Sequence, residues 1–365
     1  VNIIREEAEM LSQKKDKTKY DCLLNNYDRS LNTKVLKKLF NRLEKFIKRK
    51  LPLILKKQEQ TNGSLTMYEL SEEDQFKLSK IFMKKLGFDF NKGRIDKSIH
   101  PFCGGSTNDI RITTRFNEND SFSCFDALMH ETGHGIYEQN LPKRWSHQPL
   151  GSSGGMSLHE SQSLLIEMQI IKSLPVSKFI QNVLQKQIKK NSIELNYEDI
   201  YRSRKKVTKN FIRVDADEVH YPLHIIHRFN IEYKIIEDNF NVDYLPDLWN
   251  EEFFKLFNID VDSDKNGCLQ DIHWYGGDFG YFPTYSLGAI IAAQLMHKIK
   301  KNIPNLSSNF ENGNFKSTIK WLRRNVHEKG NSFEINEILE QATDEKLNLD
   351  YFENHISNRY IKELY

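Results

Sequence analysis

The stretch that decides the fold runs from Met129 to Glu138, MHETGHGIYE, and contains the pattern H-E-x-x-H at residues 130–134. Positions four apart lie on one face of a helix, so His130 and His134 can direct their imidazoles at one metal ion. Glu131 projects beside them, where its carboxylate can take a proton from a metal-bound water. The alternative is a short amphipathic helix with two half-buried histidines. The pattern predicts a catalytic metal site on a helix.

The residues around this pattern favour a site. The preceding segment is apolar at helical spacing, as in a helix that enters a core. Ser123 and Asp126 have the spacing of a capping box at the start of this helix. Gly133 and Gly135 lie inside the predicted helix, where each costs about 1 kcal/mol relative to alanine. This cost predicts that another backbone or a substrate approaches the helix closely.

A catalytic zinc needs three protein ligands and one open position. The best third ligand is Glu160 in the segment LHESQ, on the helix expected after a long loop. Ser157 and Glu160 also have the spacing of a capping box, so the residues alone leave ligand and cap open for Glu160. His220 and His224 form a rival pair four apart, but Pro222 lies between them and no glutamate follows the first histidine.

Composition limits the class of protein. The chain has 365 residues, of which 38% are hydrophobic and 28% charged, with 53 basic and 50 acidic residues. It is long enough for one large core or two lobes, and its charge is too balanced to predict a nucleic-acid partner. It contains no apolar run long enough to predict a membrane span. The four cysteines include no C-x-x-C pair, which favours free thiols, and without a signal peptide we expect a cytoplasmic protein.

The apolar periodicity predicts one mostly helical domain over residues 1–365, with its motif-bearing core at about 100–290. One convincing strand is predicted, at 109–116 after a loop at 100–105, as part of a small sheet or hairpin near the metal helix. The predicted helices include 33–55, 71–86, 157–171, 176–190, 197–209 and 212–239, with further helices after Tyr285. The first residue, Val1, already lies in a helical pattern, so we expect a fragment that lacks its own beginning.

Five ordered motifs carry a family resemblance: D-I-R-I-T at 109–113, H-E-T-G-H at 130–134, H-E-S-Q at 159–162, I-R-V-D-A-D at 212–217 and G-C-L-Q-D-I-H-W at 267–274. In these motifs the chain resembles the M32 metallocarboxypeptidases, the thermostable Taq-type carboxypeptidases. The resemblance implies that His130, His134 and Glu160 hold the metal and that Glu131 is the general base. It also implies a mainly α, two-lobed fold with a deep active-site cleft, as in neurolysin and angiotensin-converting enzyme.

The resemblance further implies a carboxypeptidase of broad specificity that forms a homodimer. Two histidines and one glutamate suit zinc, and cobalt binds the same geometry. Only 129 residues precede His130, fewer than in the family, so we expect helices of the cleft wall to be absent. Two alternatives remain open: a helical zinc endopeptidase or dipeptidase of the same fold, and an inactive truncated homologue that acts as a binding protein.

A carboxypeptidase must hold a free carboxylate and polarise a peptide carbonyl. The planar guanidinium of arginine binds carboxylate in a bidentate manner, and Arg213 and Arg111 lie in the matching motifs, with His220 and His224 as possible helpers. The alternative for Arg213 is an ion pair with Asp215 or Asp217, and for Arg111 an ion pair with Asp109. His273 and Tyr285 are suited to donate hydrogen bonds to the developing oxyanion. Tyr281 is an alternative donor, and packing is the alternative for either tyrosine.

Overall fold

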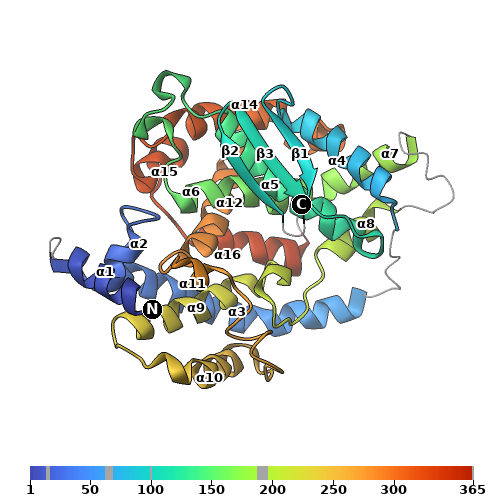
Figure 1. Ribbon diagram of the computed structural model, residues 1–365. Coiled ribbons are helices and arrows are strands. Elements are labelled where there is room, and N and C mark those ends of the chain that lie inside the picture. The colour runs from blue at the N-terminus through green and yellow to red at the C-terminus, as the bar shows by residue number, and fades with distance from the viewer. Residues whose placement is uncertain (14–16, 62–68, 99–100, 187–195, 364–365) are drawn as a thin grey trace. The chain divides into compact units, whose positions relative to one another are not determined.

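The computed structural model describes residues 1–13, 17–61, 69–98, 101–186 and 196–363. These residues are mainly helical, with one three-stranded sheet (Figure 1). The chain forms two compact units, each made of segments that are far apart in the sequence. The first unit comprises residues 1–58, 155–157 and 207–287, and the second comprises 59–154, 158–206 and 288–365. The mainly α class with a small sheet is therefore confirmed.

The first unit is built from helices alone among its described residues. Its elements are α1 (Asn2–Gln13), α2 (Lys19–Leu24), α3 (Thr33–Thr61, which runs past the unit's boundary), the 3₁₀ turn η5 (Arg213–Asp215), α9 (Tyr221–Ile236), the 3₁₀ turn η6 (Val242–Tyr244), α10 (Leu245–Phe257), α11 (His273–Gly276) and the start of α12 (Pro283–Asn302).

A buried glutamate ties the first unit together. Glu232 on α9 is fully buried and accepts hydrogen bonds from the Tyr20 hydroxyl at 2.6 Å, the Trp274 indole at 2.8 Å and the Gly280 amide at 3.0 Å. Burial raises the pKa of Glu232 to about 7, although these donors lower it. Three segments far apart in the sequence are thereby joined through one carboxylate.

The second unit contains the sheet and the remaining helices. Its elements are α4 (Glu72–Leu86), β1 (Gly93–Lys97), β2 (Phe102–Ser106), β3 (Asp109–Thr114), η1 (Glu118–Asp120), α5 (Ser121–Gln139), η2 (Lys143–Trp145), η3 (Pro149–Gly151), α6 (Met156–Leu164), the π-helical η4 (Leu165–Ile171), α7 (Leu174–Lys186), α8 (Tyr197–Arg204), α13 (Leu306–Glu311), α14 (Lys316–Asn325), η7 (His327–Lys329), α15 (Ile335–Thr343), α16 (Asp350–Ser357) and the π-helical η8 (Asn358–Lys362).

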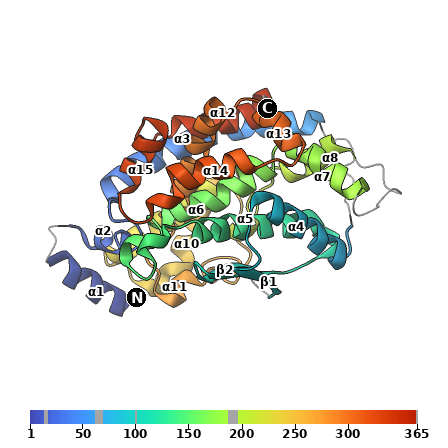
Figure 2. The same cartoon turned by 90° about the horizontal axis from the view of Figure 1, so that it is seen from above.

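The sheet lies against α5, as Figures 1 and 2 both show. The strand order is β1-β3-β2, with β1 parallel and β2 antiparallel to the central β3. Ile110 and Ile112 on β3 alternate with exposed neighbours and are buried, which is the pattern of a strand with one face on a core. The predicted strand is confirmed over Asp109–Thr114. The predicted loop at 101–105 is wrong, because Phe102–Ser106 pairs with β3; residue 100 lies outside the described residues.

The two glycines of α5 are explained by close packing on two sides of the helix. A Cβ atom on Gly133 would lie 2.6 Å from the carbonyl oxygen of Gln162 on α6. A Cβ atom on Gly135 would lie 2.9 Å from the ring of Phe88 and 3.1 Å from Ile112 on β3. The close approach predicted from the sequence is confirmed, and the partner at Gly133 is another backbone.

Several helix boundaries differ from the predictions. The helix predicted at 71–86 is confirmed, because Ser71 caps the amide of Asp74 and Gly87 ends the helix at φ 93°. The predicted capping box of Ser123 and Asp126 is wrong, since α5 already begins at Ser121. The single helix predicted at 212–239 is also wrong, because the chain forms a 3₁₀ turn and then starts α9 at Tyr221, with a proline in its first turn.

No described helix combines the length and apolar character needed to cross a membrane.

Candidate metal centre

The metal centre lies in the second unit, on the facing sides of α5 and α6. His130 and His134 are one turn apart on α5, and Glu160 is on α6. The Oε2 atom of Glu160 lies 3.3 Å from His134 Nε2 and 3.7 Å from His130 Nε2. Ligand atoms on a tetrahedral ion with bonds of about 2.1 Å lie about 3.4 Å apart. The spacing of the three side chains therefore fits the ligands of one small cation, and one ligand atom from each residue lies within 4.8 Å of the other two.

The alternative role of Glu160, as a cap of its own helix, does not occur. Helix α6 begins at Met156, before the proposed cap residue. The amide and hydroxyl of Ser157 both bond to the buried carboxylate of Asp28. Glu160 is 5% exposed and has its carboxylate on the two histidines. The capping contact is therefore not formed, and the carboxylate of Glu160 lies against the two histidines instead.

A second buried glutamate orients His130. Glu167 lies seven residues after Glu160, about two helical turns, and so faces the same side. Its Oε2 atom lies 2.9 Å from His130 Nδ1, and its Oε1 atom accepts from Lys172 at 2.7 Å. An Nδ1–H that donates to Glu167 leaves Nε2 as the lone-pair nitrogen for a metal. Glu167 lies in the π-helical segment, a distortion that is common at functional sites.

The charges around the centre favour a cation. Burial lowers the pKa of His130, but Glu160 and Glu167 outweigh it and raise this pKa to about 10. Burial and the neighbouring His159 lower the pKa of His134 to about 4, so this imidazole is neutral at pH 7 and ready to bind a metal. Burial raises the pKa of Glu160, but the histidines outweigh it and lower it. The site thus holds positive charge at His130 that a divalent ion can replace.

Glu131 lies next to the ligand set but has a different environment. Its carboxylate is half-buried and forms no hydrogen bond or ion pair with the described residues. Burial raises its pKa to about 7, with Glu160 and Glu167 adding to the effect and His130 opposing it. A carboxylate that is unbonded and has a pKa near the working pH is suited to proton transfer.

Two further contacts hold the ligands in place. The ring of His159 stacks on His134 at 4.5 Å between centroids and bonds through Nε2 to Glu138 at 2.9 Å. Gly288 on α12 packs against Glu160, and a Cβ atom there would lie 2.7 Å from Glu160 Cγ. The ligand carboxylate is therefore confined by a neighbouring backbone that has no room for a side chain.

Arg213 is buried in the first unit, but its partner differs from the expected ones. Its Nε atom donates to Asp271 at 2.8 Å, and its Nη1 atom donates to the Tyr221 hydroxyl at 3.0 Å. Asp271 also accepts from the fully buried Arg228 at 2.6 Å. The ion pair considered as the alternative role of Arg213 is therefore formed, but with Asp271, 58 residues away in the sequence, and not with Asp215 or Asp217.

The two predicted oxyanion donors contact each other. His273 Nε2 lies 2.9 Å from the Tyr285 hydroxyl, and the guanidinium of Arg213 lies 4.9 Å from the centroid of the Tyr285 ring. Burial, followed by the charge of Arg213, lowers the pKa of His273 to about 4, so this ring is neutral at pH 7. Tyr281 packs against both rings, at 5.4 Å from His273 and 5.2 Å from Tyr285.

The other candidate substrate-binding residues, His220, His224 and Arg111, already contact neighbouring side chains. His220 bonds to Asp217 at 2.7 Å, and His220 and His224 are buried against Phe257, with His224 also on Phe253. These are the contacts of packed side chains. Arg111 is an exposed residue of β3 paired with Asp109 at 2.9 Å, which is the ion pair considered as its alternative.

Comparison with known proteins identifies the family of this chain. The sequence matches the family described as carboxypeptidase Taq (M32) metallopeptidase over residues 1–360. The chain belongs to the M32 metallopeptidase family. "Carboxypeptidase 1" of Bacillus subtilis is 38% identical over 351 residues, which are 93% of this chain and 68% of that protein. "Thermostable carboxypeptidase 1" of Pyrococcus furiosus is 32% identical over 366 residues, or 99% of this chain and 72% of that protein.

The solved structures agree. The structure titled "Trypanosoma Cruzi Metallocarboxypeptidase 1" superposes with a TM-score of 0.94 at 33% identity, covering 98% of this chain and 75% of that one. A structure of Pyrococcus furiosus carboxypeptidase gives a TM-score of 0.91 at 32% identity, covering 99% and 72%. The family resemblance inferred from five motifs is therefore confirmed, and this M32 chain is a metallocarboxypeptidase.

Sequence reasoning missed the residues that support the ligands of this M32 chain. Glu167 could have been found, because its spacing of seven from Glu160 puts both carboxylates on one face of one helix. Gly288 and Lys172 carry no such signal, since each acts only through a contact formed in the folded unit.

Proposed function

We propose that this chain removes single residues from the C-terminus of peptides, with His130, His134 and Glu160 as the ligands of one divalent metal and Glu131 as the general base. The observation that carries the proposal is the convergence of the three ligand side chains beside one unbonded carboxylate. Two imidazoles and a carboxylate form the ligand set of many catalytic zinc sites, so we propose zinc, with cobalt as a functional substitute.

A metal held by these residues would act as a Lewis acid and lower the pKa of a bound water. Glu131 takes the proton of the attacking water and then delivers it to the nitrogen of the leaving amino acid. The half-buried position of Glu131 keeps its pKa near neutrality, so both transfers are feasible at pH 7. Glu167 holds His130 in the tautomer that presents Nε2 to the metal.

We assign stabilisation of the oxyanion to Tyr285 and His273. The grounds are the chemistry of the two groups and the hydrogen bond between them. His273 is neutral at pH 7 and can therefore accept from the tyrosine hydroxyl or donate, depending on its tautomer. Tyr281 packs on both rings and has the supporting role in this assignment.

We assign the substrate's C-terminal carboxylate to Arg213. Two of its nitrogens are held by Asp271 and Tyr221, whereas Nη2 forms no hydrogen bond with the residues that the structure describes. A guanidinium fixed in this way can offer the remaining N–H groups to a carboxylate without further ordering. Arg111 and the pair His220 and His224 have weaker claims, because an exposed ion pair and aromatic packing already account for them.

Three further properties belong to the proposal. We propose broad side-chain specificity and a homodimer, both implied by the family resemblance, and light scattering on the purified chain tests the dimer. We propose a cytoplasmic location, because the four cysteines, Cys22, Cys103, Cys124 and Cys268, include no C-x-x-C pair, which favours free thiols.

The test compares an N-blocked peptide ending in a free carboxylate with the same peptide amidated at its C-terminus. The metal content of the protein is measured on the same sample. We expect release of one free amino acid from the acid and none from the amide. Comparable cleavage of both peptides would instead support the endopeptidase alternative, and no cleavage of either with metal bound would support the binding-protein alternative.

Two variants test the assigned residues. Glu131→Gln should retain the metal and lose about 10²–10⁴-fold in kcat, because only proton transfer is removed. Arg213→Met should raise KM for the free-acid peptide, whereas the matched variant Arg111→Met should leave KM unchanged. Full activity of metal-loaded Glu131→Gln would contradict its role as the base, and equal KM values in the two arginine variants would contradict the role of Arg213.

A further inference from the structure

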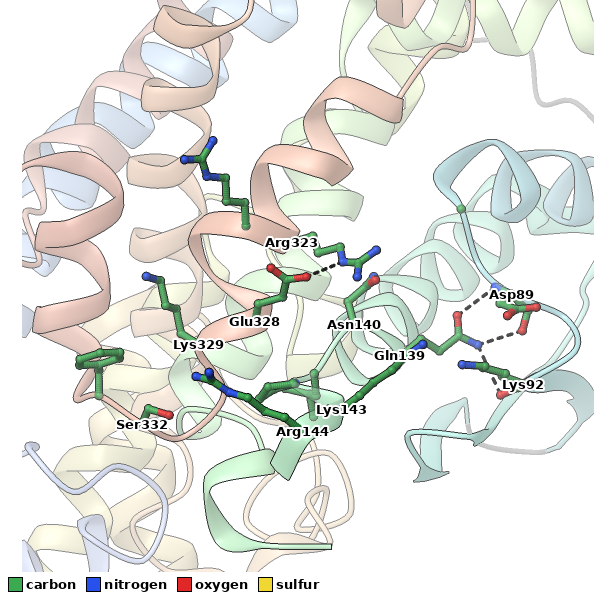
Figure 3. A pocket seen from close by; sticks show the side chains of 15 residues that line it. Asp89, Lys92, Gln139, Asn140, Lys143, Arg144, Arg323, Glu328, Lys329 and Ser332 are labelled. Atoms are coloured by element: carbon green, nitrogen blue, oxygen red, sulfur yellow. Dashed lines mark hydrogen bonds and ion pairs between the residues drawn. The ribbon is translucent and has the colours of Figure 1, made fainter. Parts of the chain in front are cut away.

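A cavity of about 880 Å³ lies in the second unit, away from the metal ligands. Four segments of the chain line it: the turn after α4 with Asp89 and Lys92, the end of α5 with the loop into η2, the last turn of α14, and the stretch from η7 to Phe333. Figure 3 shows the side chains of these segments around a common space. None of the metal ligands, Glu131 or Glu167 is among the lining residues.

Basic side chains dominate the lining of this cavity. Six of its residues are basic and two are acidic, which gives a net formal charge of +4. The whole chain carries a net charge of only +3, so positive charge is concentrated here far above the average for the molecule. The basic residues are Lys92, Lys143, Arg144, Arg323, Arg324 and Lys329.

Few of these charges are balanced by the protein itself. Arg323 pairs with Glu328 at 2.9 Å. Lys92, Lys143 and Arg324 form no ion pair with any residue that the structure describes. The neighbouring Lys92, followed by burial and Arg323, lowers the pKa of Lys143, and this effect of like charges outweighs the opposing effect of Asp89.

Helix ends do not account for the cluster. Arg323 and Arg324 occupy the last turn of α14, where a cation offsets the negative end of the helix dipole. Lys92 precedes the strand β1, and Lys329 lies in the 3₁₀ turn η7 that follows α14. The end of an α-helix therefore explains neither residue. Because α5 and α14 both end at the cavity, their exposed backbone groups are carbonyls, and any anion must be held by side chains.

We propose that this cavity is a binding site for a small molecule with an oligophosphate chain, such as inorganic tripolyphosphate or a nucleoside triphosphate. A linear triphosphate carries about four negative charges near pH 7, which matches the +4 of the lining. Arginine forks bind phosphate oxygens in a bidentate manner, and a chain of several phosphates offers oxygens to cations on more than one of the four segments. The volume is within the usual range for small-molecule sites of about 300–1,000 Å³.

Phe333 offers a way to distinguish the two candidate ligands, inorganic tripolyphosphate and a nucleoside triphosphate. Its ring is 36% exposed at the rim of the cavity, with the ammonium of Lys329 5.8 Å from the centroid. A nucleobase can stack on an exposed aromatic ring, whereas inorganic tripolyphosphate cannot. A nucleoside triphosphate that binds more tightly than tripolyphosphate, with the difference lost in Phe333→Leu, would identify the nucleotide as the ligand. Equal affinities would identify the phosphate chain alone.

The test is calorimetric titration of the purified full chain with tripolyphosphate at about 50 mM ionic strength. The double variant Lys143→Gln/Arg323→Gln should weaken binding at least tenfold, because charge-assisted hydrogen bonds are removed from two sides of the cavity. The matched control is Lys320→Gln, an exposed lysine of α14 outside the lining, which should change the affinity less than twofold. Thermal unfolding of each variant verifies that it is folded.

Three outcomes would overturn the proposal. One is no saturable binding of tripolyphosphate by the unmodified chain. Another is equal loss of affinity in Lys320→Gln and in the double variant, which would indicate attraction to overall charge. The third is equally tight binding of citrate, which would show that the site selects any polyanion rather than phosphate. The metal content after titration shows whether tripolyphosphate has removed the metal instead of binding in this cavity. The control variant Lys320→Gln has the same metal site, so removal of the metal would affect it equally.

Discussion

Replacing Glu167 by glutamine tests whether the buried carboxylate beneath His130 sets the affinity for the metal. The change keeps the shape of the side chain and removes its charge. Glutamine can still accept the Nδ1–H of His130 through its amide oxygen, but it no longer strengthens the basicity of Nε2 or balances Lys172. The perturbation therefore acts on electrostatics and leaves the packing of the helices unchanged.

Two magnitudes follow from the contacts. Loss of a carboxylate that supports a metal-binding histidine weakens metal binding by about 10–100-fold, or about 1.4–2.7 kcal/mol. Lys172 has a side chain only 16% exposed, and its remaining partner, Asp126, lies at 3.6 Å and is shared with Arg204. Breaking one side of a buried ion pair costs about 3–5 kcal/mol of folding free energy. Stability and metal affinity should therefore both fall.

A second substitution separates the two effects. In Glu167→Gln/Lys172→Met the unpaired ammonium is gone, so the thermal stability of the metal-free protein should recover while the weak metal affinity remains. Zinc affinity is measured by competition with a chromophoric chelator, and stability by calorimetry. Glu340→Gln, at an exposed glutamate of α15, is the matched control and should change neither quantity. Zinc affinity of Glu167→Gln within twofold of the unmodified chain would refute the reasoning.

Three other predictions concern packing, pH and the metal. Gly288→Ala places a methyl group 2.7 Å from Glu160 Cγ. It should lower zinc affinity about tenfold and the free energy of unfolding by about 1–3 kcal/mol, as measured by the same competition and unfolding assays. Burial raises the pKa of Asp28 to about 7, so Asp28 binds a proton in the folded state that it loses when unfolded. Its contribution to the free energy of unfolding is therefore complete below about pH 4 and is lost as the pH rises to 7. Relative to the unmodified chain, the free energy of unfolding of Asp28→Asn, measured at pH 5, 6 and 7, should rise by about 1.4 kcal/mol per pH unit. Removal of the metal with a chelator should lower the melting temperature and abolish peptide hydrolysis, and zinc should restore both; an unchanged melting temperature would contradict the predicted link between metal binding and stability.

The part of the site that sequence could predict is the part set by local spacing. His130 and His134 follow from the helical repeat of four, and Glu131 follows from its position between them. Glu160 could not be assigned from spacing alone, because a capping box and a ligand have the same local pattern. What separates the two roles is the bond from Ser157 to Asp28, a contact over 129 residues that no window of sequence contains.

The fold shows the same division between local and distant causes. The alternation of Ile110 and Ile112 predicted β3, since one face of that strand lies on a core. The strand β2 contains Gly104 and Gly105, which disfavour strands, and it forms because β3 supplies its hydrogen bonds. The ion pair considered as the alternative for Arg213 has another partner for a related reason. The nearby aspartates were the candidates visible in the sequence, whereas the fold brings in Asp271, which also accepts from Arg228.

The buried acidic groups of the second unit favour a cation at the proposed metal centre. Glu160 and Glu167 are both nearly inaccessible to water, and burying such groups is costly unless positive charge meets them. Lys172 balances Glu167, and the two carboxylates raise the pKa of His130 to about 10, so a proton on His130 can balance Glu160. A divalent ion has to displace that proton, because a ligating imidazole nitrogen must be free of hydrogen. Metal binding should therefore release protons and weaken as the pH falls, because the two carboxylates that favour a cation here also favour a proton on His130 in acid.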